Sequence, residues 1–290
     1  MDLQDANWER FCRYHVGDWY GLWTPYTMDG VALAPRQCIR SFQRTADGRA
    51  ITHHNHYRYA DGRQETKTFG PYTPATTRGV FVEASFSWGS PAVDGATPVA
   101  FETGFRAAER RVSLVVRSDA HGVWQPFVVI TEHLGRFAER PPAVEIPTLP
   151  QGCRGLRRTI TPDLRVSTPE PIAWCRLEEV GEDRLMVRVP GGLAVSLPRC
   201  LTPGQPWVGI VEWAVEATTV HRGIRTYDAT GFAQFSLDSL PPNNSCSRPL
   251  RGSVQFPHET CAGKLPRVEL HVAVSCTRLC RLLQQIFATN

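Results

Sequence analysis

The chain has 290 residues, of which 42% are hydrophobic and 21% are charged, and its net charge is +4. These values are ordinary for a globular protein with a large core, and no run of 18 apolar residues predicts a membrane span. The basic residues are spread along the chain without a lysine-rich block, so we expect no nucleic-acid partner.

The N-terminal segment shows no secretory signal, because residues 1–8 contain two aspartates and no apolar stretch. We therefore expect an intracellular protein. The sequence then predicts a short helix over residues 7–16, with Asn7 as its N-cap and Phe11 on its apolar stripe. Gly17 is expected to end this helix.

Residues 17–134 alternate between apolar and polar side chains, which is the period of β-strands. Residues 79–88 are predicted to form one strand, with one face made of Val80, Val82, Ala84, Phe86 and Trp88. Residues 111–117 are predicted to send Val112, Leu114 and Val116 to one side and Arg111, Ser113 and Arg117 to the other. Seven or eight short strands without a crossover helix predict an antiparallel barrel or sandwich domain over residues 1–135.

Four prolines in residues 136–152 indicate a linker. Alternation resumes in residues 153–240, where six or seven strands predict a second β domain. Its stretch Gly155-Leu156, followed by Thr161, parallels Gly21-Leu22, followed by Thr27, which hints at a duplication. The alternation fades in residues 241–290, which we interpret as an atypical tail that is either poorly ordered or a lineage-specific extension.

The stretch GDWY at residues 17–20, which follows the predicted helix, resembles the signature of the lipocalins. In that superfamily the tryptophan plugs the closed end of a β-barrel, and an arginine from a late strand stacks over it. The resemblance implies this structural role for Trp19, a close approach of the chain to the barrel floor at Gly17, and a stacking arginine at Arg111 or Arg110.

Longer stretches carry a closer resemblance: GDWYGLWTPY, ITHHNHYRY, ASFSWG and RRVSLVV in the first half, and HRGIRTYDATGFAQFSLDSL in the second. Over residues 7–240 the chain resembles a two-domain, lipocalin-like (calycin) family of cyanobacteria and algae, known as domain of unknown function 3598. The resemblance implies an all-β fold, in which a lipocalin-like antiparallel up-and-down barrel is followed by a second, related β-barrel or half-barrel domain. It also implies a lipophilic ligand and a photosynthetic setting, either the cytoplasm or the plastid stroma, but no particular reaction.

The run ITHHNHYRY at residues 51–59 is the most unusual local pattern. In a strand, one face carries Ile51, His53, Asn55, Tyr57 and Tyr59. An apolar end with imidazole, amide and phenol groups suits a cavity wall that orients a ligand. The alternative is a hydrogen-bonded ladder on an exposed sheet face.

His54 and His56, on the opposite face of that run, have a spacing that would allow them to share a metal ion. No third ligand stands out, and the nine cysteines contain no Cys-x-x-Cys pair. We therefore expect no metal and no cofactor, and we expect reduced thiols.

The predicted ligand-binding set also includes aromatic and basic residues from other strands. Tryptophans at alternate strand positions fit a core as well as a pocket. An arginine on an inward face needs a partner or an anionic ligand group, whereas on an outward face it is merely solvated. The full set is His53, Asn55, Tyr57, Tyr59, Trp88, Trp124, Trp213, Arg225 and Tyr227.

No motif for a nucleophile, a P-loop or a dinucleotide-binding loop is present. The leading hypothesis, which depends on the family resemblance, is the binding of a small hydrophobic molecule such as a pigment, isoprenoid or oxylipin. The alternative is an isomerase, cyclase or chromophore lyase acting on such a molecule, with His53, Tyr57 or Tyr59 as the catalytic residue. A third hypothesis is a structural module whose barrels are filled by side chains. The sequence does not specify an oligomeric state.

Overall fold

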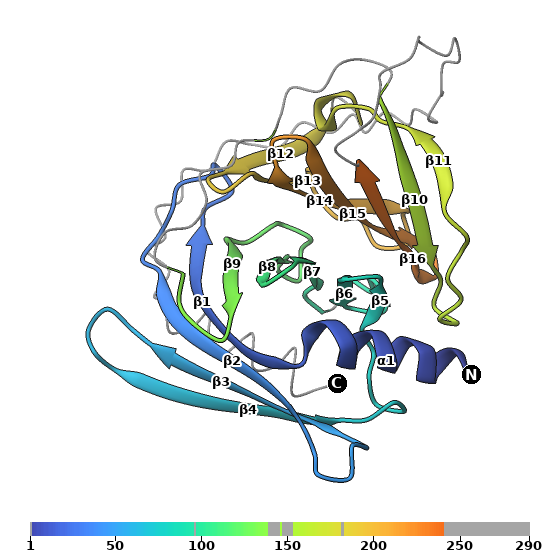
Figure 1. Cartoon of the computed structure of the whole chain (residues 1–290). Helices are drawn as coiled ribbons and strands as arrows, with labels where there is room; N and C mark the ends of the chain where they lie inside the picture. The colour runs from blue at the N-terminus through green and yellow to red at the C-terminus, as the bar shows by residue number, and fades with distance from the viewer. Residues whose placement is uncertain (1, 96, 139–145, 147–152, 181–182, 241–290) are drawn as a thin grey trace. The chain divides into compact units, whose positions relative to one another are not determined.

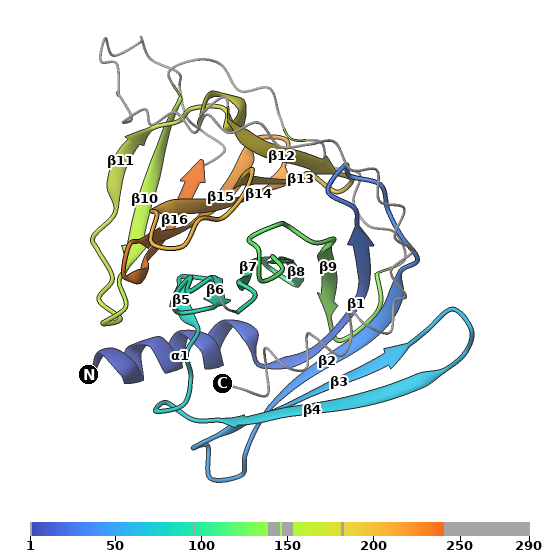
Figure 2. The same ribbon diagram turned by 180° about the vertical axis from the view of Figure 1, so that it is seen from behind.

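The computed structural model describes residues 2–95, 97–138, 146, 153–180 and 183–240. This part of the chain is nearly all β, with one α-helix and two antiparallel sheets (Figures 1 and 2). It lies within one compact unit, Met1–Cys246. The predicted tail at residues 241–290 and most of the predicted linker at 136–152 lie outside the described residues. No helix in the described ranges combines the length and the apolar character needed to cross a membrane.

Helix α1 spans Leu3–His15, so it begins earlier than the sequence pattern predicts. Its buried stripe contains Trp8 and Phe11, which pack against the first sheet. Asn7 is not the N-cap, because it lies within the helix. Its side-chain amide donates to the Gly79 carbonyl at 2.8 Å, and its oxygen accepts from the Phe81 backbone at 2.9 Å. A polar residue in the first helical turns therefore ties the helix to a strand and does not start the helix.

We expect Asn7→Ala to lower the free energy of unfolding by about 1–3 kcal/mol, because two buried backbone groups would lose their partner. Urea unfolding followed by circular dichroism would measure the change. Glu9→Ala, at an exposed position of the same helix, should stay within about 0.5 kcal/mol of the parent protein. Equal effects of the two substitutions would contradict the tethering role of Asn7.

The first sheet has nine antiparallel strands in the order β4-β3-β2-β1-β9-β8-β7-β6-β5, and Figure 1 shows that it curls. Its strands are β1 Gly17–Tyr26, β2 Arg36–Arg44, β3 Ile51–Arg58, β4 Gln64–Tyr72, β5 Val80–Val82, β6 Ser85–Gly89, β7 Ala100–Ala107, β8 Arg110–Arg117 and β9 Phe127–Leu134. Consecutive strands pair, except β4 and β5, and the last strand returns to pair with the first, which leaves β4 and β5 as the two edges. The predicted up-and-down, barrel-like architecture is confirmed.

Residues 79–88 form two strands, so the prediction of a single strand with one apolar face is wrong. A tight turn at Glu83, whose φ is +51°, separates β5 from β6 and shifts the alternation. Val80 and Val82 consequently face the second sheet, whereas Phe86 faces the helix. The sequence alone misses this turn because it contains neither glycine nor proline.

The second sheet has seven antiparallel strands in the order β11-β10-β16-β15-β14-β13-β12. They are β10 Arg154–Ile160, β11 Glu170–Ala173, β12 Arg184–Val189, β13 Leu193–Pro198, β14 Trp207–Glu216, β15 Thr219–Asp228 and β16 Gly231–Leu240, and a short 3-10 helix, η1 Leu177–Val180, precedes β12. Its last strand, β16, also pairs with its first, β10. The second sheet therefore repeats the connection pattern of the first sheet without counterparts of β3 and β4.

The turns after β1 and β10 share the same hydrogen bonds. The Thr27 amide donates to the Val31 carbonyl, and the Thr161 amide donates to the Arg165 carbonyl. A bridge closes each turn, between Tyr26 and Ala32 in the first and between Ile160 and Val166 in the second. The faint sequence parallel between the two halves thus corresponds to a repeated structural element, which supports a duplication.

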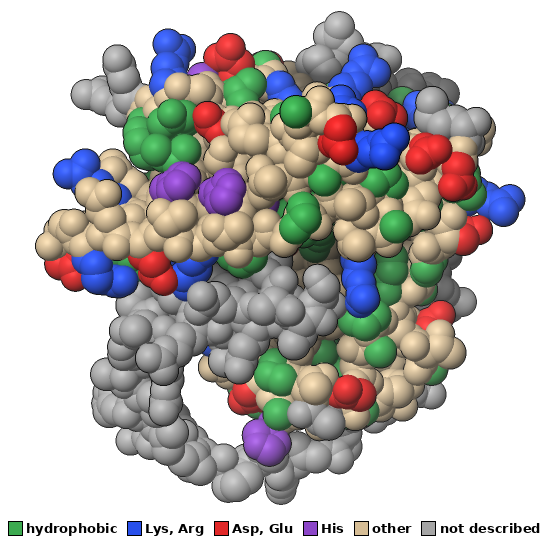
Figure 3. All heavy atoms as spheres, turned by 90° about the horizontal axis from the view of Figure 1, so that it is seen from below, with side chains coloured by type: hydrophobic (Ala, Val, Ile, Leu, Met, Phe, Trp, Pro, Cys, Tyr) green, Lys and Arg blue, Asp and Glu red, His purple; other side chains and the backbone are tan. Residues whose placement is uncertain are grey.

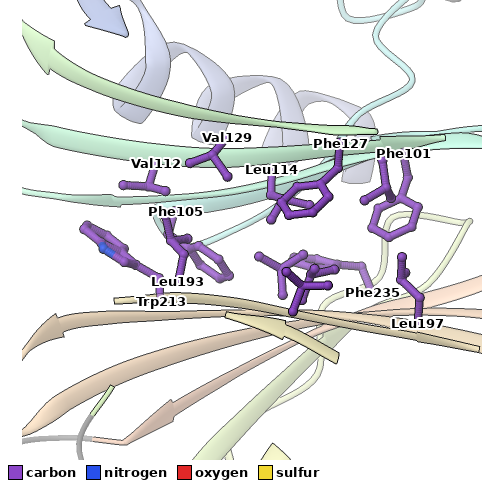
Figure 4. Close-up of a cluster of buried hydrophobic side chains, with 14 of the residues drawn as sticks. Phe101, Phe105, Val112, Leu114, Phe127, Val129, Leu193, Leu197, Trp213 and Phe235 are labelled. Carbon is purple, nitrogen blue, oxygen red and sulfur yellow. The ribbon is translucent and has the colours of Figure 1, made fainter. Parts of the chain in front are cut away.

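One hydrophobic core joins the two sheets. Figure 4 shows side chains of the first sheet pointing toward those of the second, including Phe101, Phe105, Leu114, Phe127, Leu193, Leu197, Trp213 and Phe235. Helix α1 lies behind the opposite face of the first sheet in the same view. We call that opposite face, which turns away from the second sheet, the inner face.

Candidate functional site

The inner face of the first sheet is polar, although it is buried. On β8, Val112 and Leu114 enter the core between the sheets, whereas Arg111 and Ser113 alternate with them and point to the inner face. All four residues are buried. Alternation on this strand therefore separates two buried environments instead of separating a core from solvent.

Trp19 is fully buried at one end of the inner face. Its indole N–H donates to the His15 carbonyl at 2.8 Å, and the Arg111 guanidinium carbon lies 4.2 Å from its ring centroid. Gly17 has φ of +128°, and a Cβ there would lie 2.9 Å from the Leu134 side chain. Arg110, the alternative stacking residue, instead lies over a ring of the second sheet. Of the two predicted candidates, Arg111 is thus the one that stacks on Trp19, and Arg106 also lies over the ring, 5.1 Å from its centroid.

Two carboxylates and two guanidinium groups form a buried network on the inner face. Glu132 accepts a hydrogen bond from Arg111 at 2.7 Å and lies 3.3 Å from Arg40. Glu102 accepts from Arg40 at 3.1 Å and from Ser113 at 2.6 Å. Burial lowers the pKa of Arg111 to about 10, although Glu132 opposes this shift. Burial also acts to lower the pKa of Arg40, but the two carboxylates outweigh it and the pKa is raised.

A chain of hydrogen bonds crosses the same face along β3 and β4. It connects Tyr72, His53, Asn55 and Tyr57 in that order, and we call it the relay. The His53 Nδ1 lies 3.1 Å from the Tyr72 hydroxyl, and its Nε2 lies 2.9 Å from the Asn55 side-chain oxygen. The Asn55 amide donates to the Tyr57 hydroxyl at 3.0 Å. Because an amide oxygen only accepts, His53 carries its proton on Nε2 and accepts from Tyr72. Burial, reinforced by Arg40, lowers the pKa of His53 well below its usual value, so the imidazole is neutral.

Tyr57 is the last residue of the relay, and its hydroxyl proton is not used in the hydrogen bond with Asn55. Its hydroxyl oxygen accepts from Asn55, and within the described residues no acceptor faces its O–H. Burial raises the pKa of Tyr57, so the phenol stays protonated. The Trp23 ring lies 5.3 Å from the Tyr57 ring, and its buried indole N–H has no acceptor in the described part of the chain. The two rings that carry these donors thus lie side by side, and neither donor has an acceptor among the described residues.

Tyr59 and Trp88 lie in different environments, the first among charged side chains near solvent and the second in an aromatic cluster. The Tyr59 hydroxyl donates to Glu65 at 2.7 Å, and the guanidinium carbon of Arg63 lies 3.6 Å from its ring centroid, so it belongs to the half-exposed end of the strand. Trp88 packs 5.7 Å from Tyr72, in the aromatic cluster that also contains helix α1. Trp88 therefore lies beside the Tyr72 end of the relay, and Tyr59 lies beside its Tyr57 end, with ring centroids 6.4 Å apart.

The other two predicted tryptophans lie in the core between the sheets. Trp124 donates its indole N–H to the Pro198 carbonyl at 2.7 Å. Trp213 packs 6.3 Å from Phe105 across the interface. The apolar surface that these two side chains bury stabilises the contact between the sheets, so we place them outside the ligand site.

Arg225 and Tyr227 also connect the two sheets. Arg225 donates to the Tyr227 hydroxyl at 2.8 Å and to the Ser87 hydroxyl at 3.2 Å, and Tyr227 donates to the Ser90 carbonyl at 2.7 Å. Both side chains are buried and find their partners within the protein. They need no anionic ligand group, and we remove them from the candidate ligand site.

His54 and His56 lie on the exposed side of β3, away from the relay. Each imidazole contacts a threonine of β4, Thr68 at 3.0 Å and Thr66 at 2.9 Å. Figure 3 shows two neighbouring histidine side chains on the surface seen from below. Within the described residues, no group of three or more His, Cys, Asp or Glu side chains could hold a metal ion.

Sequence analysis misses four charged residues of the inner face: Arg36, Arg40, Glu102 and Glu132. A signal for the first two exists, because RQCIRSFQR alternates and places Arg36, Cys38, Arg40 and Phe42 on one face. Charged residues on a strand face are usually read as solvated. Only the curl of the sheet shows that this face is buried.

Two comparisons with known proteins identify relatives. Residues 4–137 match the model of the N-terminal domain of DUF3598, a domain of unknown function. No curated protein matches the chain. A crystal structure of a DUF3598-family protein of unknown function from Nostoc punctiforme is 19% identical and has a TM-score of 0.64, covering 80% of this chain and 97% of that chain. The chain is therefore similar to DUF3598 proteins in the sequence of its first half and in its fold.

Proposed function

We propose that the protein binds a small hydrophobic molecule against the inner face of the first sheet. The proposal depends chiefly on one observation, the buried relay from Tyr72 to Tyr57. A purely structural face gains little from polar groups, because burying them is costly unless they are fully paired. Here the relay ends on a phenol whose proton has no acceptor in the described structure, beside Trp23, whose N–H is also unsatisfied.

The ligand class follows from the composition of this face. Rings of Trp23, Tyr57 and Trp88 offer apolar contact, and the two unsatisfied donors offer a place for one oxygen-bearing group. A pigment, isoprenoid or oxylipin has this combination of an apolar body and a few oxygens. The resemblance to lipocalins stays a prediction that favours such a ligand, and the resemblance to cyanobacterial and algal proteins favours a cytoplasmic or plastid-stroma setting.

An isomerase, cyclase or lyase acting on such a molecule is the second candidate. The specific observation in its favour is that His53 and Asn55 orient the Tyr57 hydroxyl. A general acid works best with a pKa near the working pH, whereas burial raises the pKa of Tyr57. This phenol is therefore a better hydrogen-bond donor than proton donor, which favours binding over catalysis.

Protein purified from a photosynthetic host should carry a lipophilic compound that is detectable by native mass spectrometry and in the absorbance of its organic extract. In vitro, retinol and cis-parinaric acid serve as isoprenoid and oxylipin-like probes, with tryptophan quenching and probe fluorescence as the signals. Saturable binding of either probe, or a co-purified lipophile, supports the proposal. Absence of all three would refute it and leave the structural-module hypothesis.

We expect Tyr57→Phe to weaken binding of the better probe by about 5- to 10-fold, the effect of losing one hydrogen bond. Fluorescence titration would measure the dissociation constant. Tyr20→Phe, at a half-buried position on β1 without a hydrogen-bonded hydroxyl in the described structure, is the matched control and should leave it unchanged. An unchanged dissociation constant for Tyr57→Phe would remove this hydroxyl from the site. Turnover of a probe that stops with Tyr57→Phe would favour the enzyme.

A further inference from the structure

We infer that the ligand is an amphipathic carboxylic acid and that Arg36 binds its carboxylate. This inference deepens the proposed function and depends on it. Arg36 lies at the start of β2, and only 3% of its surface is exposed. Its Nε and Nη1 atoms have no hydrogen-bond partner among the described residues, and no carboxylate of that part of the chain forms an ion pair with it. A charged group this deeply buried normally has a partner.

The other basic residues of the central inner face have acidic partners. Arg111 pairs with Glu132, Arg40 contacts both Glu132 and Glu102, and Lys67 lies 3.3 Å from the Glu65 carboxylate. Among these central residues, Arg36 is the basic side chain for which the described residues supply no carboxylate. Arg117, on the Arg111 side of β8 by alternation, is also buried, and its Nε and Nη1 have no partner in the described ranges. Both features favour a negatively charged ligand group.

Arg36 lies over the two rings whose donors have no acceptor among the described residues. Its guanidinium carbon is 5.0 Å from the Tyr57 ring centroid and 5.4 Å from the Trp23 ring centroid. Contact with these aromatic faces holds the cation in place without neutralising it. A guanidinium, an indole N–H and a phenol O–H can each donate to an oxygen, and a carboxylate offers about four acceptor positions. No carboxylate of the described protein takes this place, so a ligand carboxylate fits it best.

Binding of cis-parinaric acid and of its methyl ester tests the inference, because the two probes share the same polyene and differ only in charge. We expect the unaltered protein to bind the acid at least tenfold more tightly than the ester. Arg36→Met should weaken acid binding by a similar factor and leave ester binding within about twofold. Arg44→Met, on the same strand but exposed, is the matched control and should preserve the preference for the acid.

Stability provides an independent readout. Removing an unpaired buried charge should leave the thermal midpoint of Arg36→Met equal to or above that of the parent. Arg36→Lys, which keeps the charge but loses the planar fork, should retain part of the acid preference and serves as a second variant.

The outcomes separate the two proposals. Equal binding of acid and ester by the unaltered protein, or an acid preference that survives Arg36→Met, would overturn the role of Arg36 and leave hydrophobic binding intact. Absence of saturable binding of retinol and of both parinaric probes would overturn the proposed function together with this inference.

Discussion

Glu132→Gln is expected to lower the free energy of unfolding by about 3–5 kcal/mol, because it removes one member of a buried ion network. Glu132 lies between Arg111 at 2.7 Å and Arg40 at 3.3 Å, and its side chain is fully buried. Without the carboxylate, two guanidinium groups would remain close together, with Glu102 as their only acidic neighbour in this network. Denaturant unfolding at neutral pH, followed by circular dichroism, would measure the loss.

Glu178→Gln is the matched control for this substitution. Glu178 pairs with Arg188 at the surface, where both side chains are more than two-fifths exposed. A surface ion pair contributes about 0–1 kcal/mol, so the control should unfold close to the parent. A loss of less than about 1 kcal/mol for Glu132→Gln would show that the inner-face network is not stabilising.

Trp19→Ala is expected to cost about 3–5 kcal/mol, the range for a fully buried large aromatic side chain. The indole touches the guanidinium groups of Arg111 and Arg106, at 4.2 and 5.1 Å, and it also binds the last turn of α1 through the His15 carbonyl. Its removal would open a void beneath the ion network and detach the helix end. The midpoint of denaturant unfolding and the near-ultraviolet circular dichroism signal should both fall.

Phe137→Ala, the same kind of truncation at a site that is 41% exposed, is the control and should cost less than about 1 kcal/mol. Trp19→Phe should recover part of the loss, because a smaller ring still fills much of the space. If Trp19→Ala were no more costly than Phe137→Ala, the indole would not be the plug of this end of the sheet.

The relay residues show how far local pattern can group the residues of a candidate site. Alternation in residues 51–59 correctly grouped His53, Asn55 and Tyr57, because a strand places every second side chain on one face. Trp213 and Arg225 satisfied the same kind of pattern, yet they lie in the core between the sheets. Alternation of apolar and polar residues along a strand shows which side chains share a face, but it does not show what covers that face.

The amino-acid sequence by itself determined most of the strands and the up-and-down connectivity, because alternation and turn residues act over a few positions, but it missed the turn between β5 and β6. It also singled out the indole at position 19. Only the tertiary structure decided that both faces of β8 are buried, that Arg111 and not Arg110 covers Trp19, and that Arg36 has no acidic partner among the described residues. Pairing of charges across a curled sheet joins residues that are distant in sequence, such as Arg40 and Glu102. That pairing depends on the curvature and packing of the whole sheet, which no short segment encodes.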